Sequence, residues 1–279
     1  TPSTGSRIRP WRTWRGVSLR PVMSHVDPAF AYAQARMQSR YGERPVAADW
    51  QHLEATRDLG AVLQVLRGGK LARWTGRFAA RPGVHEIERR LREEWLRAVD
   101  EVAAWQPEGW REGTRWMRWI VHLPALQKLA RGGRAPAWMR TDAVLGPIVA
   151  REPRERGPAL MGTPLAPLAA GFADPPDVAR AWARHWQELW PRDAAARAPL
   201  AELLAAIRAS RERLAQAPPE ATSRDSIVAL ERRLALLFRR NPLSPTATAA
   251  YVSLMQLDLQ RVRGLLAVRA LRDAPVAAP

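Results

Sequence analysis

The chain has 279 residues, of which 47% are hydrophobic and 25% are charged, a balance typical of a globular protein. It contains no cysteine, which excludes disulfide bonds, thiolate zinc sites, iron–sulfur clusters and a cysteine nucleophile. Basic residues outnumber acidic ones by 44 to 27, so the formal net charge is +17 and partners that carry negative charge must be considered.

Residues 1–25 form a basic segment in which Arg7, Arg9, Arg12, Arg15 and Arg20 are accompanied by no acidic residue. The segment has no helical period, and we expect it to be a disordered extension. Two alternatives stay open: an arginine-rich transit peptide, and a translation start assigned upstream of Met23.

Helical periodicity starts at Asp27 and continues through almost the whole chain, with no convincing alternation of the kind that strands show. The sequence therefore predicts an all-α fold. Asp27 and Pro28 are typical of an N-cap and the first helical residue, and Gly42 ends this helix. We expect one further helix between Pro45 and the pair Gly68-Gly69.

The clearest helix is predicted from about His85 to Trp105. Apolar residues form a regular seam along it: Ile87, Leu91, Trp95, Val99 and Val102. Acidic residues lie among arginines on the other positions, and we interpret them as a solvated face rather than a general acid–base pair: Glu86, Glu88, Glu93, Glu94, Asp100 and Glu101.

A further helix is predicted between Trp116 and Ala130, with a kink at Pro124. The composition then changes, because eight of the 24 prolines lie between Pro136 and Pro176. We predict a long connection there, with short helices at most, for example around Leu165 to Ala170.

A second helical block follows the connection and ends in the longest helix, which starts at Ser244-Pro245. Two apolar stripes on this last helix predict that it is buried on two sides. The predicted organisation is an extension (1–25), an N-terminal helical block (26–139), a Pro/Gly-rich connection (140–176) and a C-terminal helical block (177–275).

Motifs that would indicate chemistry are absent from the sequence. The five histidines are far apart, and no phosphate-binding loop, dinucleotide fingerprint or nucleophile elbow occurs, so we expect no catalytic residue, no cofactor and no metal ligand. The most site-like cluster is His185 between Trp182 and Trp186. We interpret it as helix packing, and an enzyme pocket at this place is the alternative.

Tryptophans interleaved with arginines could stack nucleic-acid bases, and they could equally pack a helical core: Trp105, Trp110, Trp116, Trp119 and Trp138. Among the 44 basic residues only Lys70 and Lys128 are lysine. We therefore attribute part of the arginine excess to the overall amino-acid usage of the chain and not to a binding function. An Arg/Trp-rich module that binds nucleic acid or protein therefore remains the alternative function, with nucleic acid the less favoured partner.

Four segments resemble the C/d family of rotary ATPase subunits, named C in the archaeal-type (A-type) and d in the vacuolar-type (V-type) enzymes. They are 30–37 (FAYAQARM), 86–91 (EIERRL), 123–132 (LPALQKLARG) and 250–265 (AYVSLMQLDLQRVRGL). The chain departs from the family pattern in the last segment, where Asp258 remains of an acidic pair and Arg261 replaces an expected Asn. It is also shorter than most members, and the Pro-rich middle replaces part of a helical layer.

The resemblance implies a non-catalytic helical funnel of similar units that couples the central stalk to the membrane rotor ring and supports ion transport. In this chain we expect the Pro-rich connection at the centre of that fold. Its implied partners are stalk and rotor-ring subunits, and anionic lipid headgroups are a further possibility for a basic protein. The implied location is cytoplasmic and peripheral to the membrane. On the resemblance, the positions expected to contact partners are Arg36, Arg40, Arg261 and Arg263.

Overall fold

The computed structural model describes residues 27–173, 176–192, 194–216 and 224–273. The extension expected at residues 1–25 lies outside these described residues. Every regular element within them is a helix, and none of them belongs to a strand, so the predicted all-α class is confirmed.

The α-helices of the described residues occur in the following order: α1 (Pro28–Gly42), α2 (Ala47–Ala55), α3 (Leu59–Gly68), α4 (Ala72–Thr75), α5 (Val84–Ala104), α6 (Glu108–Trp116), α7 (Leu123–Ala130), α8 (Gly146–Val149), α9 (Arg156–Leu160), α10 (Val178–Glu188), α11 (Ala194–Gln216), α12 (Arg224–Arg240) and α13 (Pro245–Asp273). Four short 3₁₀ segments lie between them: η1 (Met117–His122), η2 (Ala137–Thr141), η3 (Pro153–Glu155) and η4 (Ala166–Phe172).

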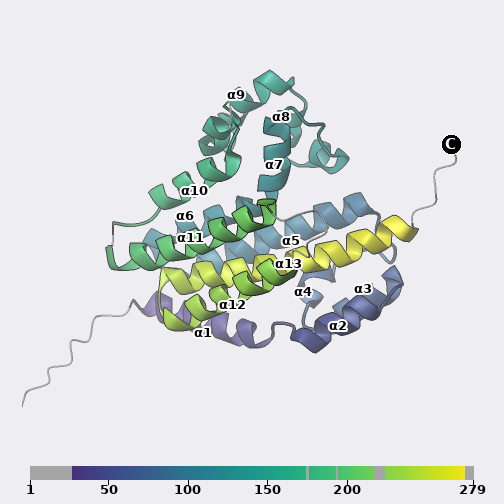
Figure 1. The fold of residues 1–279 in the computed structure, drawn as a ribbon, viewed down its shortest axis with the longest axis horizontal. Coiled ribbons are helices and arrows are strands. Elements are labelled where there is room, and N and C mark those ends of the chain that lie inside the picture. Colours follow the sequence, from purple (N-terminus) through teal and green to yellow (C-terminus); the bar gives the residue numbers. More distant parts are fainter. Residues whose placement is uncertain (1–26, 174–175, 193, 217–223, 274–279) are drawn as a thin grey trace, which may run out of the picture.

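The long helix α13 runs through the middle of the molecule and organises the other helices (Figure 1). It packs against α12, α11 and α5, and it also contacts α1, α3 and α6. The first predicted stripe, which includes Val252, Leu259 and Val262, is buried throughout. The second stripe is buried at Leu254 but 48% exposed at Val268, so α13 is covered on two sides only in its first half. One continuous core joins the predicted N-terminal and C-terminal blocks through α13.

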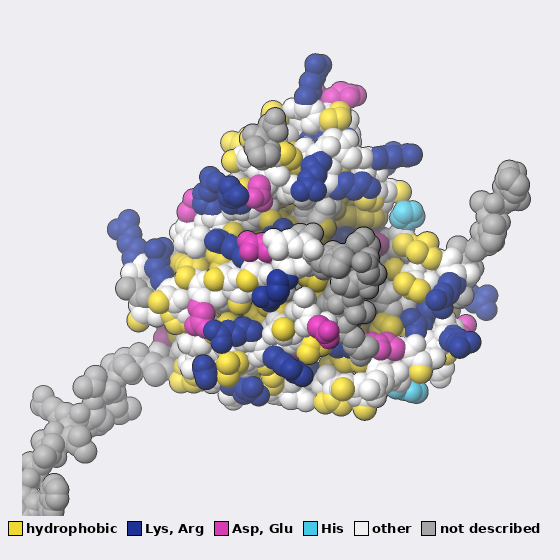
Figure 2. Space-filling model, in the orientation of Figure 1, with side chains coloured by type: hydrophobic (Ala, Val, Ile, Leu, Met, Phe, Trp, Pro, Cys, Tyr) yellow, Lys and Arg dark blue, Asp and Glu magenta, His cyan; other side chains and the backbone are white. Residues whose placement is uncertain are grey.

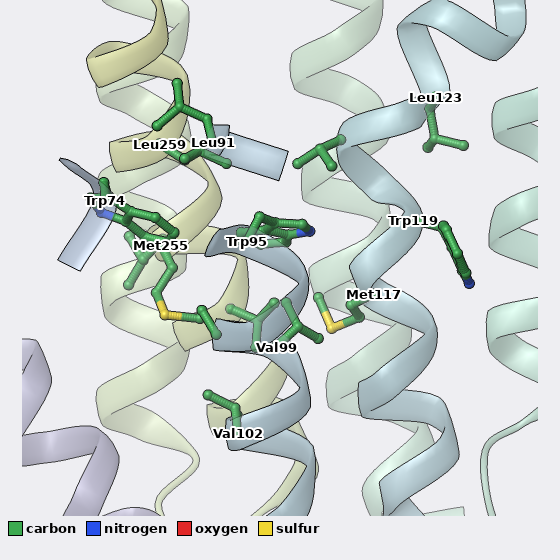
Figure 3. Packing of buried hydrophobic residues seen from close by; sticks show 14 of the residues in the cluster. Trp74, Leu91, Trp95, Val99, Val102, Met117, Trp119, Leu123, Met255 and Leu259 are labelled. Atoms are coloured by element: carbon green, nitrogen blue, oxygen red, sulfur yellow. The ribbon is translucent and has the colours of Figure 1, made fainter. Parts of the chain in front are cut away.

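Helix α5 also contributes a row of buried residues to this core. All five residues of its predicted seam are buried, because a repeat of three and four positions places them on one face. Trp95 is fully buried, and its indole Nε1 donates a hydrogen bond of 2.8 Å to the carbonyl of Arg118. Figure 3 shows Trp95 at the centre of the packed side chains, with Leu91 and Leu259 on one side of it and Met117 on the other.

The prediction of one helix between Pro45 and Gly68 is wrong, because the structure has two helices there, α2 and α3. The backbone of Thr56 is extended, with φ of −74° and ψ of 118°, which ends α2. The Asp58 carboxylate then accepts a hydrogen bond from the amide of Ala61 and caps α3. The helix predicted around Pro124 is also divided, into α6, η1 and α7, because proline occupies the first turn of α7.

The predicted connection contains short helices, as expected: α8 and α9 alternate with η2, η3 and η4 between the longer helices. With α7 and α10 it forms the upper layer of Figure 1. Gly171 of η4 lies directly against α10, where a Cβ atom would come within 2.6 Å of the Cα of Val178. Because no real side chain tolerates that distance, glycine permits the close packing of η4 on α10.

Candidate functional site

Three of the four segments in the family resemblance lie together in the structure, on α1, α5 and α13. Ion pairs connect these helices across long sequence separations. The guanidinium of Arg40 on α1 donates to both carboxylate oxygens of Glu101 on α5, at 2.7 and 2.5 Å. Arg44, just after α1, donates to both oxygens of Asp258 on α13 at 2.8 and 2.9 Å. The same Arg44 reaches Glu231 of α12 at 2.9 Å.

The hydrogen bonds within these pairs favour the charged forms of their members, and burial opposes them. The hydrogen bond from Arg40 is the main cause that lowers the pKa of Glu101, and the reciprocal bond raises the pKa of Arg40. Burial opposes the charge of Arg44, but the hydrogen bonds and charges of Asp258 and Glu231 outweigh it and raise the pKa of Arg44. Burial is the main influence on Asp258 and raises the pKa of its carboxyl group, against the hydrogen bond and charge of Arg44, which lower it. The pairs from Arg40 and Arg44 fix α1 on α5 and α13.

A cleft of about 610 Å³ opens beside these ion pairs, with walls from α1, α4, α5 and α13. Arg40 and Arg44 form one wall, and Arg73 of α4 faces them. The floor is aromatic and apolar, since Trp74 and Met255 line the cleft and both are almost completely buried. Figure 3 shows Trp74 of α4 beside Met255 of α13.

A second, smaller cavity of about 220 Å³ lies at the other face of α5. Its polar centre is Glu88, which is only 6% exposed. The carboxylate accepts from Arg92 at 2.5 Å and from Arg263 of α13 at 2.5 Å. The Arg92 guanidinium also lies over the ring of Trp138, 3.5 Å from its centre. The interpretation of Glu88 as part of a solvated face is therefore wrong, because Arg263 of α13, which is 175 residues later in the sequence, binds its carboxylate.

The four arginines expected to contact partners are placed in two regions. Arg36 and Arg40 both lie over the ring of Trp105, at 5.6 and 4.8 Å from its centre. Arg261 lies over the ring of Trp50 at 4.1 Å, and Arg263 binds Glu88. Arg36 remains exposed, whereas the guanidiniums of Arg40 and Arg263 are already bound to carboxylates of this chain.

The cluster of Trp182, His185 and Trp186 is built mainly from packed aromatic rings. Trp182 and Trp186 are buried and their rings stack at 5.5 Å, and the Trp186 indole donates to the carbonyl of Gly113 at 2.9 Å. His185 contacts the ring of Trp116 edge-on at 4.5 Å. Its Nδ1 lies 3.1 Å from the carboxylate of Glu188. Neither of the two cavities described above includes His185.

Positive side chains are spread over the surface rather than gathered in one place on the face that Figure 2 shows. Acidic side chains lie among them on the same face. Elsewhere in the described chain, too, charges are paired, for example Lys70 with Asp49 at 2.8 Å and Arg97 with Glu94 at 2.7 Å. On the face that Figure 2 shows, positive charge therefore does not mark a single groove.

Comparison with protein families, with curated proteins and with solved structures found no match to this chain. Among the described residues, no helix is both long and apolar enough to cross a membrane. The same residues include no group of three or more histidine and acidic side chains arranged to hold a metal ion.

Proposed function

We propose that the chain is a non-catalytic helical adaptor that couples the central stalk of a rotary ATPase to its membrane rotor ring, as the resemblance to the C/d family implies. In this role it works by surface complementarity, as a rigid block between two partners. Its partners are then stalk and ring subunits, and its place is on the cytoplasmic side of the membrane, peripheral to it.

The packing of the resembling segments is the observation that supports this proposal. Residues 30–37, 86–91 and 250–265 are far apart in sequence, yet they lie on α1, α5 and α13, and α13 packs against both of the other helices. Gln34 of the first segment also accepts a hydrogen bond from the amide of Leu243, just before the helix of the third. Segments that resemble one family and form one structural unit favour a shared scaffold.

The rigidity of this unit suits a part that transmits torque. Bidentate pairs from Arg40 to Glu101 and from Arg44 to Asp258 join α1 to both α5 and α13. Such forked pairs fix both distance and orientation. The exposed Arg36 lies beside this unit and offers a positive charge to an acidic partner.

The test is an affinity purification of the tagged protein from its native host in a gentle detergent, at low and moderate salt, with mass spectrometry of the bound proteins. We expect rotor-ring and stalk subunits to be recovered. Their absence, with nucleic acid or unrelated proteins in their place, would overturn the proposal. In the case of nucleic acid, recovery should fall steeply with salt.

A pair of charge-reversal variants locates the contact. R36E places a negative charge beside α1, and we expect it to reduce recovery of the partner subunits at moderate salt. R154E is the matched control, since Arg154 is also exposed but lies on η3 in the upper layer. Equal losses from both variants would show that net charge alone, and no defined face of α1, governs the interaction.

A further inference from the structure

We propose that the cleft between α1, α4, α5 and α13 binds a small organic carboxylate, whose anionic group pairs with Arg73 and whose apolar body lies over Trp74 and Met255. The inference stands on this cleft alone and does not depend on a rotary ATPase role. Its volume of about 610 Å³ lies in the range of small-molecule sites.

Arg73 is the residue that marks the cleft as a site. The cations around it are paired: Arg40 with Glu101, Arg44 with Asp258, and Arg97 with Glu94. Lys70, at the rim, pairs with Asp49. Within the described chain, in contrast, no carboxylate lies within ion-pair distance of Arg73. Arg73 acts on the charge of Glu101 only at longer range, so among the described residues its partly buried guanidinium has no direct ion pair and can bind an anion.

Neighbouring side chains hold Arg73 in place without neutralising it. Its Nη1 lies 3.7 Å from the sulfur of Met255, and its guanidinium is 5.0 Å from the centre of the Trp74 ring. It also interacts with the hydroxyl of Tyr251. Burial raises the pKa of Tyr251, and this side chain, which is only 1% exposed, supports Arg73 from the protein interior.

The chemical class of the ligand follows from charge and from the floor of the cleft. Among the described residues that line the cleft, Arg73 is the cation without an ion pair and Glu43 is the carboxylate without one. One unpaired positive charge matches a singly charged carboxylate better than a doubly charged phosphate. Leu71, Trp74 and Met255 line the cleft with only 3 to 4% of their surface exposed, which suits a short apolar body attached to that carboxylate.

The binding test uses the full-length purified chain and three probes: hexanoate, its neutral analogue hexanamide, and inorganic phosphate. Titration calorimetry and saturation-transfer NMR measure binding. We expect hexanoate to bind at least about tenfold more tightly than either other probe, as a charge-assisted hydrogen bond implies. Equal binding of hexanamide, tighter binding of phosphate, or no binding of hexanoate would overturn the inference, and this comparison needs no variant.

Variants then assign the contact to Arg73. We expect R73M to weaken hexanoate binding about tenfold or more. R73K keeps the positive charge but lacks the paired N–H donors of the guanidinium, so it should weaken hexanoate binding less than R73M does. R77M is the control, because Arg77 lies in the turn after α4, is 65% exposed at its side chain and does not line the cleft. Circular dichroism establishes that each variant is folded. Unchanged binding by folded R73M, or an equal loss in R77M, contradicts the assignment.

Discussion

His122 should make the protein less stable in mild acid, and the structure gives the size of the effect. The ring is 1% exposed, and its Nε2 lies 4.0 Å from the carboxylate of Asp142. Burial is the main cause that lowers the pKa of His122 from 6.5 to about 4. The nearby guanidiniums of Arg92 and Arg118 act in the same direction, and Asp142 opposes them.

The sign follows from which state takes up the proton. Below pH 6.5 the histidine of the unfolded chain becomes charged, whereas the folded ring stays neutral until the pH approaches about 4. Folding stability is therefore highest above pH 6.5 and is lost as the pH falls through this interval. Between about pH 7 and about pH 5 the loss from this one group is about 2 kcal/mol.

Urea unfolding, followed by far-ultraviolet circular dichroism at both pH values, measures this loss. H122Q cannot take up the proton, so the difference in unfolding free energy between the two pH values should shrink by about 2 kcal/mol. H85Q is the matched control, since His85 is exposed at the start of α5 and should leave the difference unchanged. The reasoning fails if H122Q and the unmodified protein lose the same free energy.

Three substitutions test the packing and the caps, each by urea unfolding. W95A removes a fully buried ring and its hydrogen bond to the Arg118 carbonyl, and should cost about 3 to 5 kcal/mol; a loss below about 1 kcal/mol would contradict the central place of Trp95. E88Q leaves the partly buried Arg92 and the exposed Arg263 without their shared counter-ion and should cost about 2 kcal/mol, and an exposed solvated Glu88 would instead give almost no change. D27A removes the side chain that accepts from the amide of Ala29 and should cost about 1 kcal/mol, whereas no change would show that α1 does not need this cap.

Local patterns in the sequence were sufficient to predict most helices. The seam of α5 follows from helical spacing alone, and the start of α1 follows from Asp27 and Pro28. The break between α2 and α3 had a signal as well, in the capping residue Asp58, but the apolar spacing continued across it and favoured one helix. Periodicity reports which face is buried, and it is a weaker guide to where a helix ends.

The candidate sites were much harder to predict, because tertiary contacts create them. Glu88 has arginines on its own helix, which is the pattern of an exposed face, and its burial depends on Arg263 from α13. Similarly, nothing near Arg73 in the sequence indicates that Tyr251 and Met255 will lie beside it. Among the expected partner-contact residues, Arg40 and Arg263 bind carboxylates of the chain itself, which sequence spacing cannot reveal.

The central place of α13 also has a consequence for synthesis on the ribosome. Arg44 is 214 residues ahead of its partner Asp258, so at typical rates of translation roughly 10 to 40 seconds separate the two. During that interval the apolar faces of α1 and α5 lack the helix that covers them. Nascent chains in this state are exposed to aggregation, and chaperones that shield apolar surface would act on them until α13 emerges and closes the core.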